Sequence, residues 1–356
     1  MLIAPDRMGA LSSSDAGRVL ADGWPGAMVR PAGEAGAGFG EATADRWRVP
    51  LQSGVVDGVP LEWAATPDRL VLALRDAPST VPSDSDRDGA IPYAASSVTL
   101  GHAVTSLLVE TRPTTLLLDL AGLDTHDAGA GLLAGLGARG TGAELTAGVE
   151  GLHGLADVDL APVRERLAGI ELVGVVPSSQ RDDPLLGLRG ITSRRGRAAG
   201  EDAARLLATD AVLQRLTELV APDQAHVAGA GACGGLGWAV LALGGRLSTG
   251  PRLALAGAPT ALDLVVTGCE VFDFASRGGG VVAAAAALAA DRLCPCVVVA
   301  GEVLIGGREM RTLGVEAAYA VRPSTADRPT GAEPDRAQWG AELARTVTRV
   351  SRSWRW

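Results

Sequence analysis

Short apolar runs, each followed by a glycine-rich or polar loop, recur along this chain of 356 residues. Such runs predict buried strands, and the amphipathic segments between them predict helices. The predicted strands cover residues 1–5, 115–121, 170–176, 262–268, 296–300 and 317–321. The predicted helices cover residues 16–24, 100–110, 132–136, 200–219, 281–290 and 338–351. Because strand and helix alternate without a repeat period, the pattern predicts an α/β chain with a mostly parallel sheet.

Residues 47–78 differ from the rest, because apolar and polar positions alternate there between turns at Asp57-Gly58 and Pro67-Asp68. This alternation is typical of antiparallel strands. The polar segments 79–88 and 323–334 are predicted to be surface connections. Since a chain of this length is long for one hydrophobic core, the pause in the βα alternation predicts a domain boundary near residue 45.

Composition and charge narrow the class of protein. Hydrophobic residues make up 47% of the chain and charged residues 21%, which is typical of a folded globular protein. The formal net charge is −9, and the arginine cluster at residues 194–197 is too short for a nucleic-acid face. The four cysteines do not form a secreted disulfide framework, and neither a signal peptide nor a membrane-spanning run is visible. We therefore expect a cytoplasmic protein without nucleic-acid or membrane partners.

The stretch Gly229–Gly237 holds five glycines in nine residues and precedes an apolar, helix-periodic run. The open backbone N–H groups of such a loop, at the start of a helix, can bind a phosphate or a carboxylate. The alternative is a glycine-rich packing loop between a strand and a helix. The stretch also fits G-x-G-x-x-G, but no acidic residue ends a strand about twenty positions on, which argues against a nicotinamide dinucleotide.

A polar cluster, residues 124–127, follows the predicted strand 115–121. It contains His126 between Thr125 and Asp127. A histidine beside carboxylates can act as a base or a metal ligand, although it more often caps a helix or forms a local hydrogen bond. The chain contains no lysine, which excludes a Walker A phosphate loop.

Six loops, taken in order, match the pattern of one family. They are Ile3-Ala-Pro-Asp6 with Leu11-Ser12, Glu34-Ala-Gly36-Ala-Gly38 with Glu41, Ala121–Gly131, Asp182–Gly187, Gly229–Gly237, and Val266-Thr-Gly268 with Asp273. In this order and spacing the chain resembles the bacterial type-1 glycerate kinases from about residue 3 to about residue 320. The stretch Gly229–Gly237 differs from the family's G-A-G-A-A-G-G-L-G only at Cys233.

The resemblance implies ATP-dependent phosphorylation of D-glycerate with magnesium. It implies a Rossmann-like (flavodoxin-like) three-layer domain built from both chain ends, residues 1–45 and 262–356. A middle α/β domain, residues 46–261, is inserted, and the active site lies between the domains. Asp127 and Asp273 are the implied catalytic residues, and the metal ligands stay open. The implied substrate- or nucleotide-binding residues are Asp6, Ser12, Glu34, Gly36, Asp182, Asp183, Gly229, Gly231, Gly234, Gly235, Gly268 and Ser276.

The departures from the family pattern fall on polar positions. Seven polar side chains of the family are replaced here: a lysine by Met8, a serine by Leu123, an aspartate by Gln180, a glutamate by Cys269, an arginine by Val271, a glutamine by Ala275 and a second lysine by Gly280. A family aspartate is also replaced by Glu34. Phosphoryl transfer depends on fixed positive charge, and one donor contributes about 2.7–4 kcal/mol. Arg7, Arg181 and Arg277 lie near the lost charges in sequence and are candidates to replace them.

The sequence therefore leaves two hypotheses of equal weight. The first is a divergent glycerate kinase whose ligands are a hydroxy acid and a nucleotide. The second is a catalytically impaired homologue that acts as a binding or structural protein, for which a protein partner or a homo-oligomer stays open. The second is suggested because glycines and apolar residues match the family while polar residues are lost.

Overall fold

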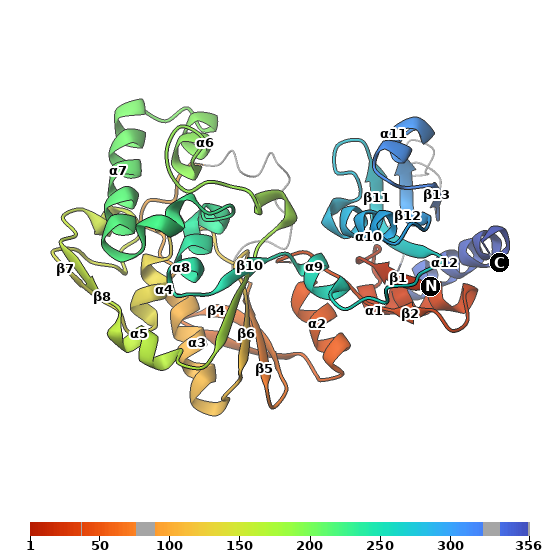
Figure 1. Ribbon diagram of the computed structural model, residues 1–356, viewed down its shortest axis with the longest axis horizontal. Coiled ribbons are helices and arrows are strands. Elements are labelled where there is room, and N and C mark those ends of the chain that lie inside the picture. The colour runs from red at the N-terminus through yellow and green to blue at the C-terminus, as the bar shows by residue number, and fades with distance from the viewer. Residues whose placement is uncertain (37, 76–89, 323–334, 355–356) are drawn as a thin grey trace. The chain divides into compact units, whose positions relative to one another are not determined.

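The structure is a computed structural model that describes residues 1–36, 38–75, 90–322 and 335–354 (Figure 1). Its contacts divide the chain into two compact units. The outer unit comprises Met1–Glu34, Glu41–Arg48 and Gly250–Trp356, and the inner unit comprises Ala35–Gly40 and Val49–Thr249. The predicted surface connections at 79–88 and 323–334 lie outside the described residues. The predicted domain limits near residues 45 and 262, and a site between the domains, stay predictions.

The outer unit contains a five-stranded parallel sheet in the order β13-β12-β11-β1-β2. Its strands are β1 (Leu2–Pro5), β2 (Met28–Val29), β11 (Val265–Asp273), β12 (Cys296–Leu304) and β13 (Ala317–Ala320). Strands β1 and β11 are in register from Leu2 beside Val265 to Pro5 beside Gly268. The strands are continuous apolar runs because a parallel sheet is covered on both faces.

Helices cover both faces of this sheet. They are α1 (Ser13–Gly23), α9 (Gly250–Leu255), α10 (Gly279–Asp291), α11 (Gly307–Thr312) and α12 (Arg336–Ser353). On one face Ile3 shares a hydrophobic cluster with Leu20 of α1 and Leu343 of α12. On the other face Leu2 shares a cluster with Val282 of α10. Three layers and the flavodoxin-like strand order confirm the predicted fold class.

The strand order reverses once, between β1 and β11. From β1 the chain adds β2 on one side, and later it adds β11, β12 and β13 on the other side. In open α/β sheets, ligands bind outside the carboxyl ends of the strands at such a switch point. The loop Asp6–Ser12, which follows β1, and Gly268 on β11 lie there; we call Asp6–Ser12 the switch-point loop.

Strand β11 is longer than the sequence pattern predicts. The expected loop from Cys269 is strand as far as Asp273, which pairs with Leu304 of β12. The extension is stabilised because Cys269 and Phe272 are both buried in the cluster that contains Leu2.

The main sheet of the inner unit has the order β10-β9-β6-β5-β4-β3. Its strands are β3 (Gln52–Val56), β4 (Val59–Ala65), β5 (Arg69–Leu74), β6 (Thr115–Asp119), β9 (Glu171–Val175) and β10 (Arg246–Ser248). Strands β3, β4 and β5 are antiparallel, as the alternation at 47–78 predicts, and β5, β6, β9 and β10 are parallel. A separate antiparallel pair consists of β7 (Arg139–Thr141) and β8 (Asp157–Asp159).

The helices of the inner unit pack around one apolar cluster. They are α3 (Val98–Glu110), α4 (Ala130–Gly135), α5 (Ala161–Arg166), α6 (Ile191–Ala198), α7 (Ala203–Val220) and α8 (Leu236–Ala242). Leu72 and Leu118 of the sheet share this cluster with Leu132 of α4 and Trp238 of α8. Helix α2 (Phe39–Trp47) begins in the inner unit, and its residues from Glu41 onward belong to the outer unit. No helix within the described ranges is both long and apolar enough to cross a membrane.

Candidate functional site

The switch-point loop begins with Asp6, directly after β1. The Asp6 backbone N–H donates to the carbonyl oxygen of Gly268 at 2.9 Å, which fixes the loop against β11. The half-buried Asp6 carboxylate accepts the N–H of Arg7 at 2.8 Å. Burial, helped by the charge of Glu34 and opposed by the Arg7 N–H, raises the pKa of Asp6 to about 7. Asp6 therefore exchanges a proton near neutral pH.

Met8 fills the space beside Gly268. Its side chain is fully buried in the cluster of Ile3 and Leu20. A methyl group at Gly268 would lie 2.7 Å from the Met8 sulfur and 3.0 Å from the Val299 carbonyl oxygen. Gly268 is thus required by packing, and the position where the family has a lysine is a core position here.

Gly9 is the tightest point of the loop. It adopts a positive φ of 56°, and a methyl group there would overlap the buried indole of Trp339, 2.0 Å from its nearest atom. Its N–H donates to the carboxylate of Glu270 on β11. The loop is therefore held by α12 and by β11.

Ser12 is the N-cap of α1. Its Oγ accepts the N–H of Asp15 at 3.1 Å. The Asp15 carboxylate pairs with Arg18 and with Arg336, both at 2.5 Å. An acidic first turn works against an anion at this helix end, so binding by Ser12 stays a prediction.

Asp273 and Ser276 form a turn at the end of β11. Asp273 Oδ1 accepts the Ser276 N–H at 2.6 Å and the Ser276 hydroxyl at 2.7 Å. Burial favours the protonated form of Asp273, but these hydrogen bonds favour the charged form more strongly, so the pKa of Asp273 is lowered. Arg277 next to them is exposed and has a positive φ of 53°.

Gly36 belongs to the inner unit, whereas the buried Glu34 belongs to the outer unit. The Gly36 N–H donates to both oxygens of Asp119, at 3.0 and 2.9 Å. Asp119 ends β6, is fully buried, and also accepts the N–H of Ala121 at 3.1 Å and a guanidinium N–H of Arg75 at 3.4 Å. Burial raises its pKa, and Arg75 opposes that change. Asp119 was not among the predicted site residues, although a carboxylate within an apolar run is a signal in the sequence.

Asp127, in the loop Ala121–Gly131, is fully buried. Its carboxylate accepts the N–H of Ser97 at 2.8 Å and the Ser97 hydroxyl at 2.9 Å. It also accepts the N–H groups of Gly129 at 2.9 Å and Gly131 at 3.1 Å. Burial raises its pKa, and these donors oppose the rise. In this geometry Asp127 holds the start of α3 against the start of α4, and its predicted catalytic role stays a prediction.

Three motif loops of the inner unit, Ala121–Gly131, Asp182–Gly187 and Gly229–Gly237, pack directly on one another. A methyl group at Gly234, which has a φ of 68°, would lie 1.9 Å from the Thr125 carbonyl oxygen. At Gly231 it would lie 2.3 Å from the Pro184 carbonyl oxygen. Close backbone approach alone therefore accounts for these glycines.

The backbone of Gly229–Gly237 is also engaged within the protein. Its N–H groups donate to protein oxygens at Ala230, Gly231, Ala232, Cys233, Gly235 and Trp238, the last just beyond the loop. The acceptor for Cys233 is the Gln180 side chain, at 2.8 Å. Of the two readings of this stretch, the geometry therefore supports packing directly. Anion binding by Gly229, Gly231, Gly234 and Gly235 stays a prediction.

Helix α6 contacts all three motif loops, and its arginines were not among the predicted site residues. Arg194 forms a two-bond ion pair with Asp183, at 2.7 and 2.6 Å. Arg195 does the same with Asp124, at 2.8 and 3.0 Å. A methyl group at Gly231 would lie 2.7 Å from the side chain of Ile191, the first residue of α6. By contrast, the predicted residue Asp182 is exposed and pairs with its neighbour Arg181 at 3.0 Å.

His126 is buried, and its hydrogen bond is to a distant helix and not the local one expected of such a histidine. Its Nε2 lies 2.9 Å from the Thr192 hydroxyl at the start of α6. Burial, together with the charge of Arg195, lowers its pKa to about 4. The imidazole is therefore neutral at physiological pH.

Across the described ranges, no three His, Cys, Asp or Glu side chains gather as a metal site.

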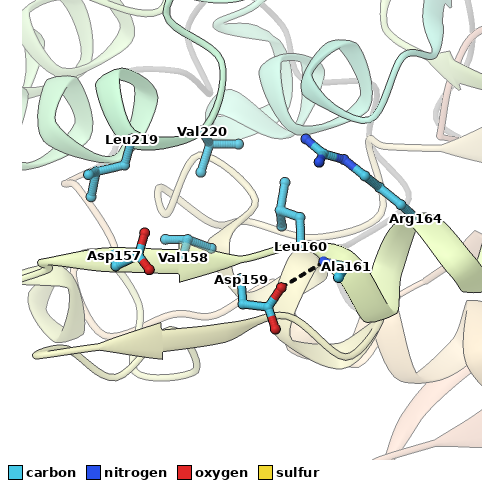
Figure 2. A pocket seen from close by; sticks show the side chains of 8 residues that line it. All are labelled: Asp157, Val158, Asp159, Leu160, Ala161, Arg164, Leu219 and Val220. Carbon is cyan, nitrogen blue, oxygen red and sulfur yellow. Dashed lines mark hydrogen bonds between the residues drawn. The ribbon is translucent and has the colours of Figure 1, made fainter.

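A groove of about 460 Å³ lies elsewhere in the inner unit (Figure 2). Leu219 and Val220, at the end of α7, face β8 and Arg164 of α5 across it. Asp159 accepts the N–H of Ala161, the first residue of α5, at 2.8 Å. No predicted site residue lines this groove, and we assign it no role.

The outer unit defines an α/β protein of the flavodoxin-like class with a polar loop at its switch point. Residues 1–355 match the Glycerate kinase family, and the chain belongs to that family. An uncharacterized protein of Mycobacterium bovis is 30% identical over 355 residues, which cover 90% of this chain and 84% of that protein. The glycerate 2-kinase of Escherichia coli is 28% identical over 250 residues, covering 65% of this chain and 64% of the enzyme.

A solved structure supports the fold. The Salmonella typhimurium LT2 protein that carries the name glycerate kinase 2 superimposes with a TM-score of 0.75. The match covers 99% of this chain and 97% of that protein at 22% identity. At this identity the likeness establishes the fold, and the activity requires a separate argument.

Proposed function

We propose that the protein transfers the γ-phosphoryl group of ATP to a hydroxyl group of a small hydroxy acid, with D-glycerate as the first candidate. Family membership supports the reaction class. The observation that carries the proposal is the placement of Asp6 and Arg7 at the carboxyl end of β1, beside the switch point with β11. That is where proteins of this sheet order bind ligands.

Arg7 is the residue we assign to the phosphate charge. It is exposed, it directly follows Asp6, and its charge reaches the Asp6 carboxylate. Met8, at the position of the family's lysine, is buried and cannot carry this charge. Arg181 already pairs with Asp182, and it lies in the inner unit. A fixed guanidinium suits this role because it offers several donors to phosphate oxygens.

The other predicted residues enter the proposal with narrower roles. Asp127 and Asp183 hold the motif loops in place through Ser97 and Arg194. Asp273 shapes the turn after β11 and is the second acidic candidate at the site. Magnesium belongs to the nucleotide in this proposal, because phosphates and waters supply most of its ligands in such enzymes. A cytoplasmic location stays a prediction, and a protein partner or a second copy of the chain stays open.

The alternative is a catalytically impaired member of the family that binds a ligand without transferring phosphate. The observation that favours it is the loss of the family's lysines and one arginine, combined with the burial of Met8. Under this alternative the switch-point loop would still bind an anion, but no product would form.

A coupled ADP-release assay with ATP, Mg²⁺ and D-glycerate, extended to other 2-hydroxy acids, tests the proposal. We expect turnover in the wild-type protein and a loss of at least tenfold in kcat/KM for Arg7→Met, because one fixed cation near the γ-phosphate is removed. Arg181→Met is the matched control and should stay within about twofold. Thermal stabilisation by ATP without any turnover would support the impaired homologue instead.

A further inference from the structure

We propose that Asp6 is the catalytic residue that accepts the proton of the substrate hydroxyl. This inference rests on the proposed function and assigns one step of it. The geometry points to Asp6 because its carboxylate lies at the carboxyl end of β1, beside β11 and immediately before the exposed Arg7.

Their hydrogen bonds separate Asp6, which is half-buried, from the fully buried Asp119 and Asp127. Asp127 is held by two backbone glycines and by Ser97, and Asp119 is held by Gly36, Ala121 and Arg75. In the described part of the chain the Asp6 carboxylate accepts one hydrogen bond, from the Arg7 N–H. Asp127 and Asp119 therefore have evident structural partners. Asp6 keeps lone pairs available for a ligand.

The ionisable groups around Asp6 come from three elements. Glu34, in the loop after β2, is the acidic neighbour, and the Cys269 thiol, on β11, is a further ionisable neighbour. Arg7, in the same loop, is the cationic neighbour. Burial is the main cause of the pKa of about 7, Glu34 adds to it and Arg7 opposes it; such a pKa suits a general base at neutral pH.

The step balances without a further reagent. The substrate oxygen forms a bond to the γ-phosphorus of ATP, and its O–H bond breaks as the proton passes to an Asp6 oxygen. The bond between the γ-phosphorus and the β,γ-bridging oxygen breaks, and ADP leaves with that electron pair. Asp6 then returns its proton to solvent.

The pH dependence of kcat/KM, measured on wild type, Asp6→Asn and Asp6→Glu, tests the inference. We expect the wild-type value to fall tenfold per pH unit below about pH 7. Asp6→Asn should lose at least about 100-fold and should also lose this acidic limb. Asp6→Glu should retain part of the activity with a displaced limb. Asp22→Asn, an exposed aspartate of α1, is the control and should match wild type.

A second readout does not depend on turnover. In protein labelled with carbon-13 at the aspartate carboxyl groups, one NMR resonance should titrate near pH 7 and be missing in Asp6→Asn. The assignment of Asp6 is overturned if Asp6→Asn turns over with an unchanged acidic limb. It is also overturned if the wild-type protein turns over but shows no resonance that titrates near pH 7. Both outcomes leave the proposed function standing. A resonance that titrates near pH 7 in a wild-type protein without turnover would overturn the proposed function and, with it, this step.

Discussion

The switch-point loop of the outer unit and the three motif loops of the inner unit both match the family pattern, but their polar groups have different partners. In the motif loops, the Asp127 and Asp183 carboxylates and the Cys233 N–H each bond to a named group of the protein. In the switch-point loop, Asp6 is half-buried with one hydrogen bond from the described residues. A residue that matches the family and is needed for packing says little about chemistry. A residue that matches the family and destabilises the folded state points to function.

Replacement of Gly234 by alanine should have the largest effect on stability. The new methyl group would meet the Thr125 carbonyl oxygen at 1.9 Å, at a φ of 68°, so we expect a loss of about 4 kcal/mol or a failure to fold. Urea unfolding followed by circular dichroism measures it. Gly244→Ala is the matched control, since Gly244 has a φ of 79° and open space around it, and it should cost about 1 kcal/mol. Equal losses would show that the motif loops do not need close packing.

Removal of the Asp127 carboxylate should have the next largest effect. Asp127→Ala leaves the buried Ser97 hydroxyl and the N–H groups of Gly129 and Gly131 without their acceptor. We expect Asp127→Ala to lose about 3–4 kcal/mol in the free energy of unfolding, and the stability of Asp127→Asn should lie between those of wild type and Asp127→Ala. Unchanged stability combined with lost turnover would instead make Asp127 a catalytic residue and would remove the contrast between the two regions.

Acid should weaken the inner unit through His126. Its pKa is about 4 in the folded protein against 6.5 as the ordinary value, so the unfolded chain binds the extra proton between those pH values. Stability from this residue is complete above about pH 6.5 and falls by up to about 3 kcal/mol as the pH drops to 4. Urea unfolding at several pH values should show this slope, and His126→Gln should flatten it. An identical slope in the variant would contradict the burial of a neutral imidazole.

The sequence predicted the fold well because the apolar runs of β1, β6, β11 and β12 are continuous. It ended β11 too early, because Cys269-Glu-Val-Phe-Asp273 reads as a polar loop until the burial of Phe272 is known. Helix α6 was missed because its residues 191–198 include three arginines and a glycine, and its stability comes from ion pairs to distant loops. Pattern alone cannot show that Asp124 and Arg195 meet.

The candidate site was predicted in part. The order of the loops identified Asp6 and Gly268, which the structure brings together at the switch point. The matched residues alone could not show which of them serve packing, because Gly234 and Asp127 match the family as well as Asp6 does. That distinction needs distances and burial, such as the overlap at Gly234 and the donors around Asp127.

The most direct test of this contrast compares Asp6→Asn with Asp127→Asn at pH 8, measuring both urea unfolding and ADP release. Asp6 has a pKa raised from 3.8 to about 7, so the folded state holds its proton more tightly than the unfolded chain does. Stability from this residue falls as the pH rises from about 3.8 to about 7, and the full loss is present at pH 8. We therefore predict that Asp6→Asn gains about 2 kcal/mol of stability, allowing for partial exposure, and loses turnover. Asp127→Asn should lose stability and keep its turnover wherever it stays folded. A destabilised Asp6→Asn with normal turnover, beside a stable and inactive Asp127→Asn, would contradict the account.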